Sequence, residues 1–261
     1  MSSGDLTLGQ LVSAYIFILI LLIIVKVKGI QREREILISS IRMTVQLMIV
    51  GYVLAYIFGN ARPVFTILIL AFMLVFSIYN IYQRAKLPLS SGLKKKIALS
   101  MAVGVIATLT YFILVTLNVK PWFNPRYVIP IAGMIIGNTM TGVSLGVNTL
   151  LDGMHTKKQM VESALMLGAR PSEASRPIIN QAFDSAMLPT INSMVGMGIV
   201  FLPGMMTGQI IGGASPLQAI RYQIAVMLGI VGGASLTVLL FVQIGYKAFF
   251  NNRSQLRERE P

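Results

Sequence analysis

The chain has 261 residues, of which 55% are hydrophobic and only 12% charged, and its formal net charge is +13. A soluble domain of this size would expose too much apolar surface to water, so the composition indicates a protein of the bilayer. The lack of cysteine excludes disulfides and thiolate metal sites, and a single histidine excludes a histidine cluster. The sequence also lacks a G-x-x-x-x-G-K-[ST] loop, which excludes the usual cradle for nucleotide phosphates.

Seven apolar runs are long enough to cross a membrane, since a spanning helix needs about 20 residues. The first follows Asp5 without a basic n-region or a small-residue cleavage site, which predicts a retained helix and not a signal peptide. We therefore expect an all-α, polytopic membrane fold with about seven spans, forming one transmembrane domain over residues 1–261. Six spans with a re-entrant segment after Pro203 is the alternative. The expected spans are residues 6–25, 42–58, 64–82, 97–117, 127–150, 186–202 and 223–246.

Lysine and arginine are distributed unevenly among the gaps between these runs. Eighteen of the 22 fall in the first, third and fifth gaps and in the C-terminal tail. Only Arg62, Lys120, Arg126 and Arg221 fall on the opposite side. The positive-inside rule then predicts an N-terminus outside and a C-terminus in the cytoplasm of a multi-pass protein of the cell membrane. The basic residues thus indicate topology and contact with the lipid bilayer, not nucleic-acid binding.

A polar, charged segment, residues 152–185, stands between the fifth and sixth expected spans on the predicted cytosolic side. Its start near Thr156 resembles a capped helix, and Gly168 can adopt the left-handed conformation that ends one. Ser172 could then cap a second helix, which Pro177 would bend or restart. The segment predicts two short helices at an angle, projecting below the membrane. A solvated amphipathic connector is the other interpretation of its spacing.

The sequence E-S-A-L-M-L-G at residues 162–168, followed ten residues later by Ile178, resembles the EAA loop of ABC-transporter permeases, a coupling helix that docks on an ATPase subunit. It departs from that pattern at Ser163, Asn180 and Gln181, where the family has Ala, Leu and Pro. Three further stretches, residues 40–54, 128–145 and 202–224, together resemble the Fet-type permeases. That family comprises iron exporters whose plant relatives are linked to aluminium tolerance.

The resemblance implies a homodimeric permease, not an enzyme, driven by a separate cytosolic ABC ATPase that would hold the ATP and Mg²⁺. We therefore expect export of iron or another metal, with no cofactor on this chain itself. An ABC permease for a non-metal cargo, or a secondary carrier or channel without an ATPase, are the alternatives. No acidic residue lies near the middle of an expected span, which argues against proton coupling. The coupling residues that the resemblance implies are Glu162, Ala164, Leu167, Gly168, Ala169, Arg170 and Pro171.

The fifth expected span combines small residues with amides and hydroxyls. Four of its glycines form two pairs spaced four residues apart, which allows another helix to approach closely. Asn138, Thr139 and Asn148 need polar partners inside the membrane, from other helices or from water. These residues either line a pathway or only pack helices, and both interpretations stay open.

Other candidates for the pathway or its gate lie near the ends of the expected spans. Arg42 could pair with Asp184, or the two could face lipid phosphates and water separately. Residues 203–213 hold one proline and several glycines, so we expect irregular backbone around a cavity or an outer gate. Its methionines are either flexible fillers or soft ligands, which suit Cu(I) better than Fe(III) or Al(III). The complete set of candidates is Arg42, Gln46, Asn138, Thr139, Asn148, Asp184, Pro203, Met205, Met206, Thr207 and Gln209.

Overall fold

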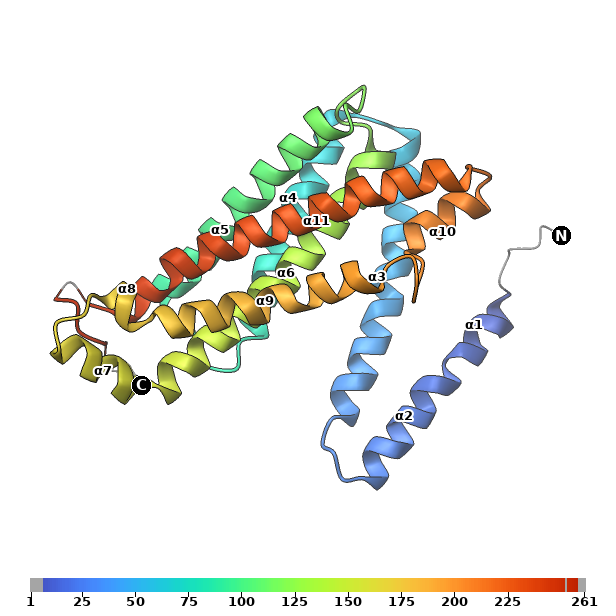
Figure 1. Ribbon diagram of the computed structural model, residues 1–261. Coiled ribbons are helices and arrows are strands. Elements are labelled where there is room, and N and C mark those ends of the chain that lie inside the picture. Colours follow the sequence, from blue (N-terminus) through green and yellow to red (C-terminus); the bar gives the residue numbers. More distant parts are fainter. Residues whose placement is uncertain (1–6, 252, 258–261) are drawn as a thin grey trace. The chain divides into compact units, whose positions relative to one another are not determined.

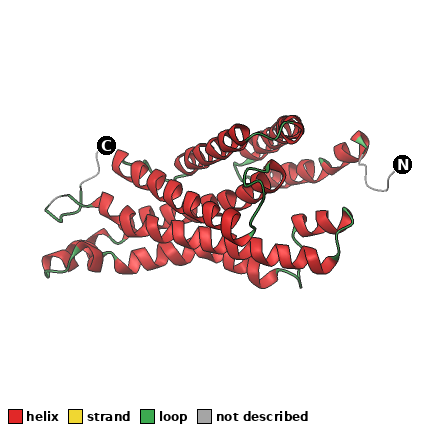
Figure 2. Cartoon of the chain, turned by 90° about the horizontal axis from the view of Figure 1, so that it is seen from above, coloured by secondary structure: helices red, strands yellow, loops and turns green. Residues whose placement is uncertain are grey.

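The computed structural model describes residues 7–251 and 253–257, and this part of the chain consists of helices and loops without a strand (Figures 1 and 2). The chain divides into two compact units, Met1–Asn60 and Ala61–Pro261. Six helices in the described chain are long and apolar enough to cross a membrane. The predicted all-α membrane fold is therefore confirmed, whereas the number of spans, their orientation and the single domain stay predictions.

The first unit contains α1 (Leu8–Ala14), α2 (Ile16–Val27) and α3 (Glu33–Gly59). α1 and α2 cover the first expected span, and residues Gly9–Val27 form one candidate span; its expected start at residue 6 lies outside the described residues. The Thr7 side chain caps α1 by accepting a hydrogen bond from the Gln10 N–H, 3.3 Å away. At the junction of α1 and α2, the Tyr15 hydroxyl shares a hydrogen bond with the Thr44 hydroxyl of α3. This bond ties the two sides of the unit together.

The second unit contains the remaining helices. Capping side chains start several of them: Ser90 accepts a bond from the Leu93 N–H, and Ser215 accepts one from the Gln218 N–H. The elements are α4 (Pro63–Gln83), α5 (Ser91–Tyr111), the π-helix η1 (Phe112–Thr116), α6 (Pro125–Thr156), α7 (Lys158–Met166), α8 (Pro171–Ala174), α9 (Arg176–Gly196), α10 (Gly204–Ile211), α11 (Pro216–Gly245) and the 3₁₀ helix η2 (Tyr246–Phe249).

The glycines of α6 show how α9 runs beside it. A Cβ on Gly146 would lie 3.3 Å from the Ala186 Cβ and 3.5 Å from the Ala182 oxygen, whereas a Cβ on Gly142 would lie 3.1 Å from the Ala186 oxygen. Residue numbers therefore rise along α9 as they fall along α6, and the two helices are antiparallel. Small residues on both sides permit this approach, as in many membrane helix pairs.

α11 runs in the same direction as α6. Near the start of the contact Ile135 faces Gly233, and near its end Leu150 faces Gly245. Because α6 and α11 are parallel, the chain between them must return along the bundle. α9 and α10 supply this return, and α10 packs on α11 (Figure 1).

The sixth expected span, residues 186–202, is wrong in its boundaries. α9 begins ten residues earlier, at Arg176, and ends at Gly196. Residues 197–203 then leave the helix, and Gly198 has a φ of +84°, which favours glycine. Pro177 restarts the helix, which is one of the two outcomes predicted for it. The segment that returns along α6 is therefore a helix that breaks after Gly196. Averaging hydropathy along the sequence places this helix too close to the C-terminus.

The expected irregular backbone over residues 203–213 is also wrong in its central part. Residues Gly204–Ile211 form the regular helix α10, preceded by Pro203 in an extended conformation. Packing against α11 offsets the low helix propensity of its glycines. Only Gly213, with a φ of +91°, takes the left-handed conformation here.

Gly104→Ala tests the close approach of α5 and α11. A Cβ at residue 104 would lie 2.1 Å from the Thr237 Oγ1 and 2.9 Å from the Thr237 Cα, so the helices would have to separate. We expect the free energy of unfolding to fall by about 1–3 kcal/mol, as for other overpacked interiors. The measurement is the melting temperature in detergent. Gly232→Ala is the control, since no described atom lies within 4 Å of a Cβ there. Equal melting temperatures of the two variants would contradict this packing.

Candidate functional site

The turn between α7 and α8 is built on Gly168. This residue has a φ of +89°, and the N–H of Ala169 donates a 3.0 Å hydrogen bond to the Ala164 oxygen. The Gly168 N–H donates to the Leu165 oxygen, also at 3.0 Å. These bonds close the end of α7 in the manner of a Schellman motif. The predicted left-handed helix end at Gly168 is confirmed.

The predicted caps around this turn are wrong. Thr156 ends α6, with its hydroxyl donating to the Asp152 oxygen at 2.9 Å, and α7 begins at Lys158 without a side-chain cap. The reason is that α6 continues past the expected end of its span while its apolar face stays buried. Ser172 lies inside α8, whose capping contact comes from Glu173: its Oε2 accepts the Arg170 N–H at 2.8 Å.

Two large apolar side chains stand exposed at the tip of this turn. Met166 is 84% exposed and Leu167 is 89% exposed, and we call this pair the apolar tip. The sequence identified Leu167 through the family pattern but missed Met166, whose exposure depends on where α7 ends. The sequence signal that could have identified Met166 is the helix-ending glycine directly after two large apolar residues, in Met-Leu-Gly at residues 166–168.

The other expected coupling residues support the turn. Glu162 forms a partly exposed ion pair with Lys158 along α7, at 3.6 Å. Ala164 and Ala169 pack against the core of the second unit, and Arg170 is exposed. Pro171 supplies the first residue of α8, where its missing N–H costs nothing.

Ile178 fixes the base of α9 on α6. It is fully buried, and its Cγ2 lies 2.5 Å from the position that a Cβ of Gly153 would occupy. Ala174 and Ser175, between the tip and α9, are buried as well. The apolar tip is therefore linked to the membrane helices by a short, packed connection and not by a loose loop.

The polar residues of α6 have separate surroundings. The Asn138 Nδ2 donates to the Met134 oxygen at 2.8 Å, within its own helix. Thr139 is fully buried, and its hydroxyl has no hydrogen-bond partner among the described residues. Asn148 binds the connection after α4: its Oδ1 accepts the Lys86 N–H at 2.8 Å and its Nδ2 donates to the Arg84 oxygen at 3.3 Å. Asn148 thus has a structural contact that sequence reasoning did not foresee.

The remaining pathway candidates are not brought together into one cluster. Gln46 is exposed on α3 and Asp184 is exposed on α9. The predicted pair of Arg42 with Asp184 joins residues of the two units and stays a prediction. On α10, beginning after Pro203, Met206 is buried, Met205 and Gln209 are partly buried, and the Thr207 hydroxyl donates to the Pro203 oxygen at 3.1 Å.

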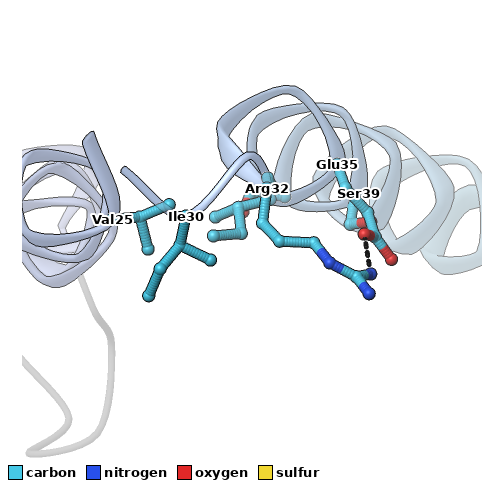
Figure 3. Close-up of a pocket in the computed structure, with 7 residues that line it drawn as sticks. Val25, Ile30, Arg32, Glu35 and Ser39 are labelled. Atoms are coloured by element: carbon cyan, nitrogen blue, oxygen red, sulfur yellow. Dashed lines mark hydrogen bonds and ion pairs between the residues drawn. The ribbon is translucent and has the colours of Figure 1, made fainter. Parts of the chain in front are cut away.

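The first unit contains a hollow of about 530 Å³ between the end of α2 and the start of α3 (Figure 3). Val25 and Ile30 lie on one side, and Arg32 forms an exposed ion pair with Glu35. The charged groups of this hollow therefore already have partners. In the described part of the chain, no group of three or more His, Cys, Asp or Glu residues could hold a metal ion.

The helices define the chain as an all-helical, multi-pass membrane protein. It belongs to the family described as "Uncharacterised protein family (UPF0014)", which matches residues 8–250. This finding and the relatives below confirm the predicted resemblance to the Fet-type permeases.

Three relatives illustrate the family. "Probable iron export permease protein FetB" of Escherichia coli is 36% identical over 256 residues, covering 98% of this chain and 97% of the relative. "Protein ALUMINUM SENSITIVE 3" of Arabidopsis thaliana is 37% identical over 245 residues, covering 94% and 88%. "UPF0014 membrane protein YjkA" of Bacillus subtilis is 37% identical over 245 residues, covering 94% and 96%. No solved structure matches the chain.

Asn148→Leu tests whether this amide holds the connection after α4. Leucine has a similar size but would leave the Lys86 N–H and the Arg84 oxygen without this partner. We expect the free energy of unfolding to fall by about 1–3 kcal/mol and residues 84–90 to exchange amide hydrogens faster. Asn138→Leu is the control, because its amide bonds only within its own helix. Unchanged exchange at residues 84–90 would contradict the structural role.

Proposed function

We propose that this chain is the membrane-spanning permease subunit of an ABC transporter that exports iron or another metal. ATP would be hydrolysed by a separate cytosolic ATPase, and two copies of the chain would form the permease. The name of the Escherichia coli relative supports a metal cargo and outward transport. The observation that carries the proposal is the apolar tip between α7 and α8.

Exposure of the tip calls for a partner. Burying one large apolar side chain contributes roughly 1.5–3 kcal/mol, so water leaves Met166 and Leu167 without that contribution. The lipid core does not cover them in the proposed topology, because this segment carries Lys157, Lys158 and Arg170 and lies on the cytosolic side. A cleft on an ATPase subunit is a natural receptor for two adjacent apolar side chains at a rigid turn.

The connection from the tip to the membrane supports a mechanical role. α8 is only four residues long, and Ser175 then leads directly into α9. Because Ile178 is seated against Gly153, a displacement of the tip reaches α6 and α9 through packed atoms. Such a segment transmits motion only if it has two arrangements, and an ATPase dimer that closes on ATP would supply the second.

Replacing the apolar tip with serine tests the docking surface. We expect Met166→Ser/Leu167→Ser to insert normally, since both side chains are exposed, but to reduce ATPase stimulation by the chain at least about tenfold, the effect of losing one hot-spot contact. The measurement compares ATP hydrolysis and metal flux in vesicles that contain both subunits. Met160→Ser/Ser172→Ala alters the same segment away from the tip and should behave as the unchanged protein.

Two results would overturn the proposal. Full ATPase stimulation and flux by the tip variant would remove the docking role. Metal flux that proceeds in vesicles without any ATPase would point to a secondary carrier or channel.

Gly168→Pro tests the shape of the turn. Proline fixes φ near −65° and lacks an N–H, whereas Gly168 has a φ of +89° and donates to Leu165. We expect the α7–α8 turn to reorient, so that ATP hydrolysis no longer drives flux although the chain is expressed and inserted. Glu162→Lys adds a charge reversal on α7 and should weaken coupling less, since the ion pair it removes is exposed. Normal ATP-driven flux with Gly168→Pro would contradict the expected role.

A further inference from the structure

The passage between α6 and α11 is interrupted by residues 197–203, which we call the break. α9 ends at Gly196 and α10 starts at Gly204, and both lie beside α11. Within the break, the Gly198 N–H donates to the Phe201 oxygen at 2.9 Å, which folds the chain into a tight turn. Interrupted helices in transporters are places where backbone groups become available to a substrate or an ion.

A buried amide of α11 faces the break. Gln223 is 5% exposed, and its Nε2 donates to the sulfur of Met197 at 3.9 Å. Its Oε1 has no hydrogen-bond partner among the described residues. Exchanging the oxygen and nitrogen of this amide would set oxygen against sulfur, two acceptors without a proton, so the orientation with nitrogen toward sulfur is preferred. A buried amide oxygen without a donor is costly and calls for a partner.

The end of α9 contributes further electron-rich groups. The last four carbonyl oxygens of a helix lack partners within it. Of those in α9, Met194 and Gly196 accept bonds from described residues beyond the helix, and the dipole of this 21-residue helix places partial negative charge here. The break therefore brings together a helix C-terminus, a thioether and an unpartnered amide oxygen.

We infer that the break is a cation-binding site for the transported ion, held by the Gln223 Oε1, the Met197 sulfur and carbonyl oxygens at the end of α9, with the ion replacing the hydrogen bond from the Gln223 Nε2 to that sulfur. All of these donors are neutral. This inference rests on the proposed transport function and names the chemical class of the transported ion. Gln223 lies about 10 Å along α11 from Pro216, and in the proposed topology this end faces the outside. The site would then be the final binding site on the path before the ion is released outside.

The charge of the donors limits the charge of the ion. Described Asp and Glu residues of the second unit are confined to residues 152–184, and the break itself, residues 197–203, holds none. A trivalent ion bound by the buried Gln223 amide would lose part of its hydration without a compensating negative charge, which is prohibitive. A thioether beside amide oxygens suits a monovalent or divalent ion of soft or borderline character. The site therefore selects a reduced metal ion over Fe(III) or Al(III).

Direct binding to the full chain in lipid nanodiscs, without ATPase or nucleotide, tests the site. The probes are Co²⁺, whose absorption reports its ligands, Ag⁺ as a soft monovalent ion, and Al³⁺. We expect Co²⁺ and Ag⁺ to bind and Al³⁺ not to bind. Gln223→Leu should weaken Co²⁺ binding about tenfold, and Met197→Leu should weaken Ag⁺ more than Co²⁺, since sulfur prefers the softer ion.

Matched controls separate ligand loss from damage to the fold. Met227→Leu changes another buried methionine, one turn along α11 from Gln223, and Gln243→Leu changes an exposed glutamine of the same helix. Both should bind as the unchanged chain does. If Gln223→Leu does not fold, Gln223→Glu decides: a carboxylate at this position should strengthen Co²⁺ binding about tenfold relative to Ag⁺. Equal affinities in all variants, or tight binding of Al³⁺, would overturn the site.

The two proposals fail in different ways. Unchanged metal binding by Gln223→Leu, together with ATP-dependent flux by the unchanged protein, removes the site and leaves the permease. Binding that depends on Gln223 and Met197, with no flux that requires an ATPase, keeps the site and removes the ABC mechanism.

Discussion

The close packing of α6 against α9 and α11 is the interaction on which the rest of the second unit depends. In a bilayer the hydrophobic effect does not press helices together, so their association relies on van der Waals contact and on small residues that permit it. Gly142 and Gly146 bring α6 to the backbone of α9 at Ala186 and Ala182. This contact sets the antiparallel register of α9, and with it the positions of both its ends.

The register places the two proposed functional regions at opposite ends of α9. At its base, Ile178 is seated on Gly153 and leads back to the apolar tip, and just beyond its other end Met197 meets Gln223. A helix of 21 residues is about 31 Å long, so one helix joins the proposed docking surface to the proposed cation site. Pro189 removes one hydrogen bond inside α9 and offers a place where the two halves can bend.

Sequence reasoning succeeded where the structural requirement is local and failed where it depends on partners. The turn at Gly168 follows from the conformational freedom of glycine, and the family pattern follows from residues close together in the chain. The boundaries of α9 do not, because its first half is polar and is held by α6, which a hydropathy average does not detect. α10 forms despite its glycines because α11 supplies packing. The contact between Met197 and Gln223 joins positions 26 residues apart on different elements and has no sequence signal.

The neutral character of the break also suits a transporter that must release its cargo. A carboxylate beside Gln223 would hold a divalent ion more tightly, and conduction requires binding that is favourable enough for entry but weak enough for exit. Amide, thioether and carbonyl donors replace part of the hydration shell without a full opposing charge. Movement of α9 would also displace Met197 and the helix C-terminus from Gln223, which removes donors from the ion at once. In the proposed mechanism, docking of the tip and release of the ion are thus two consequences of shifting one helix.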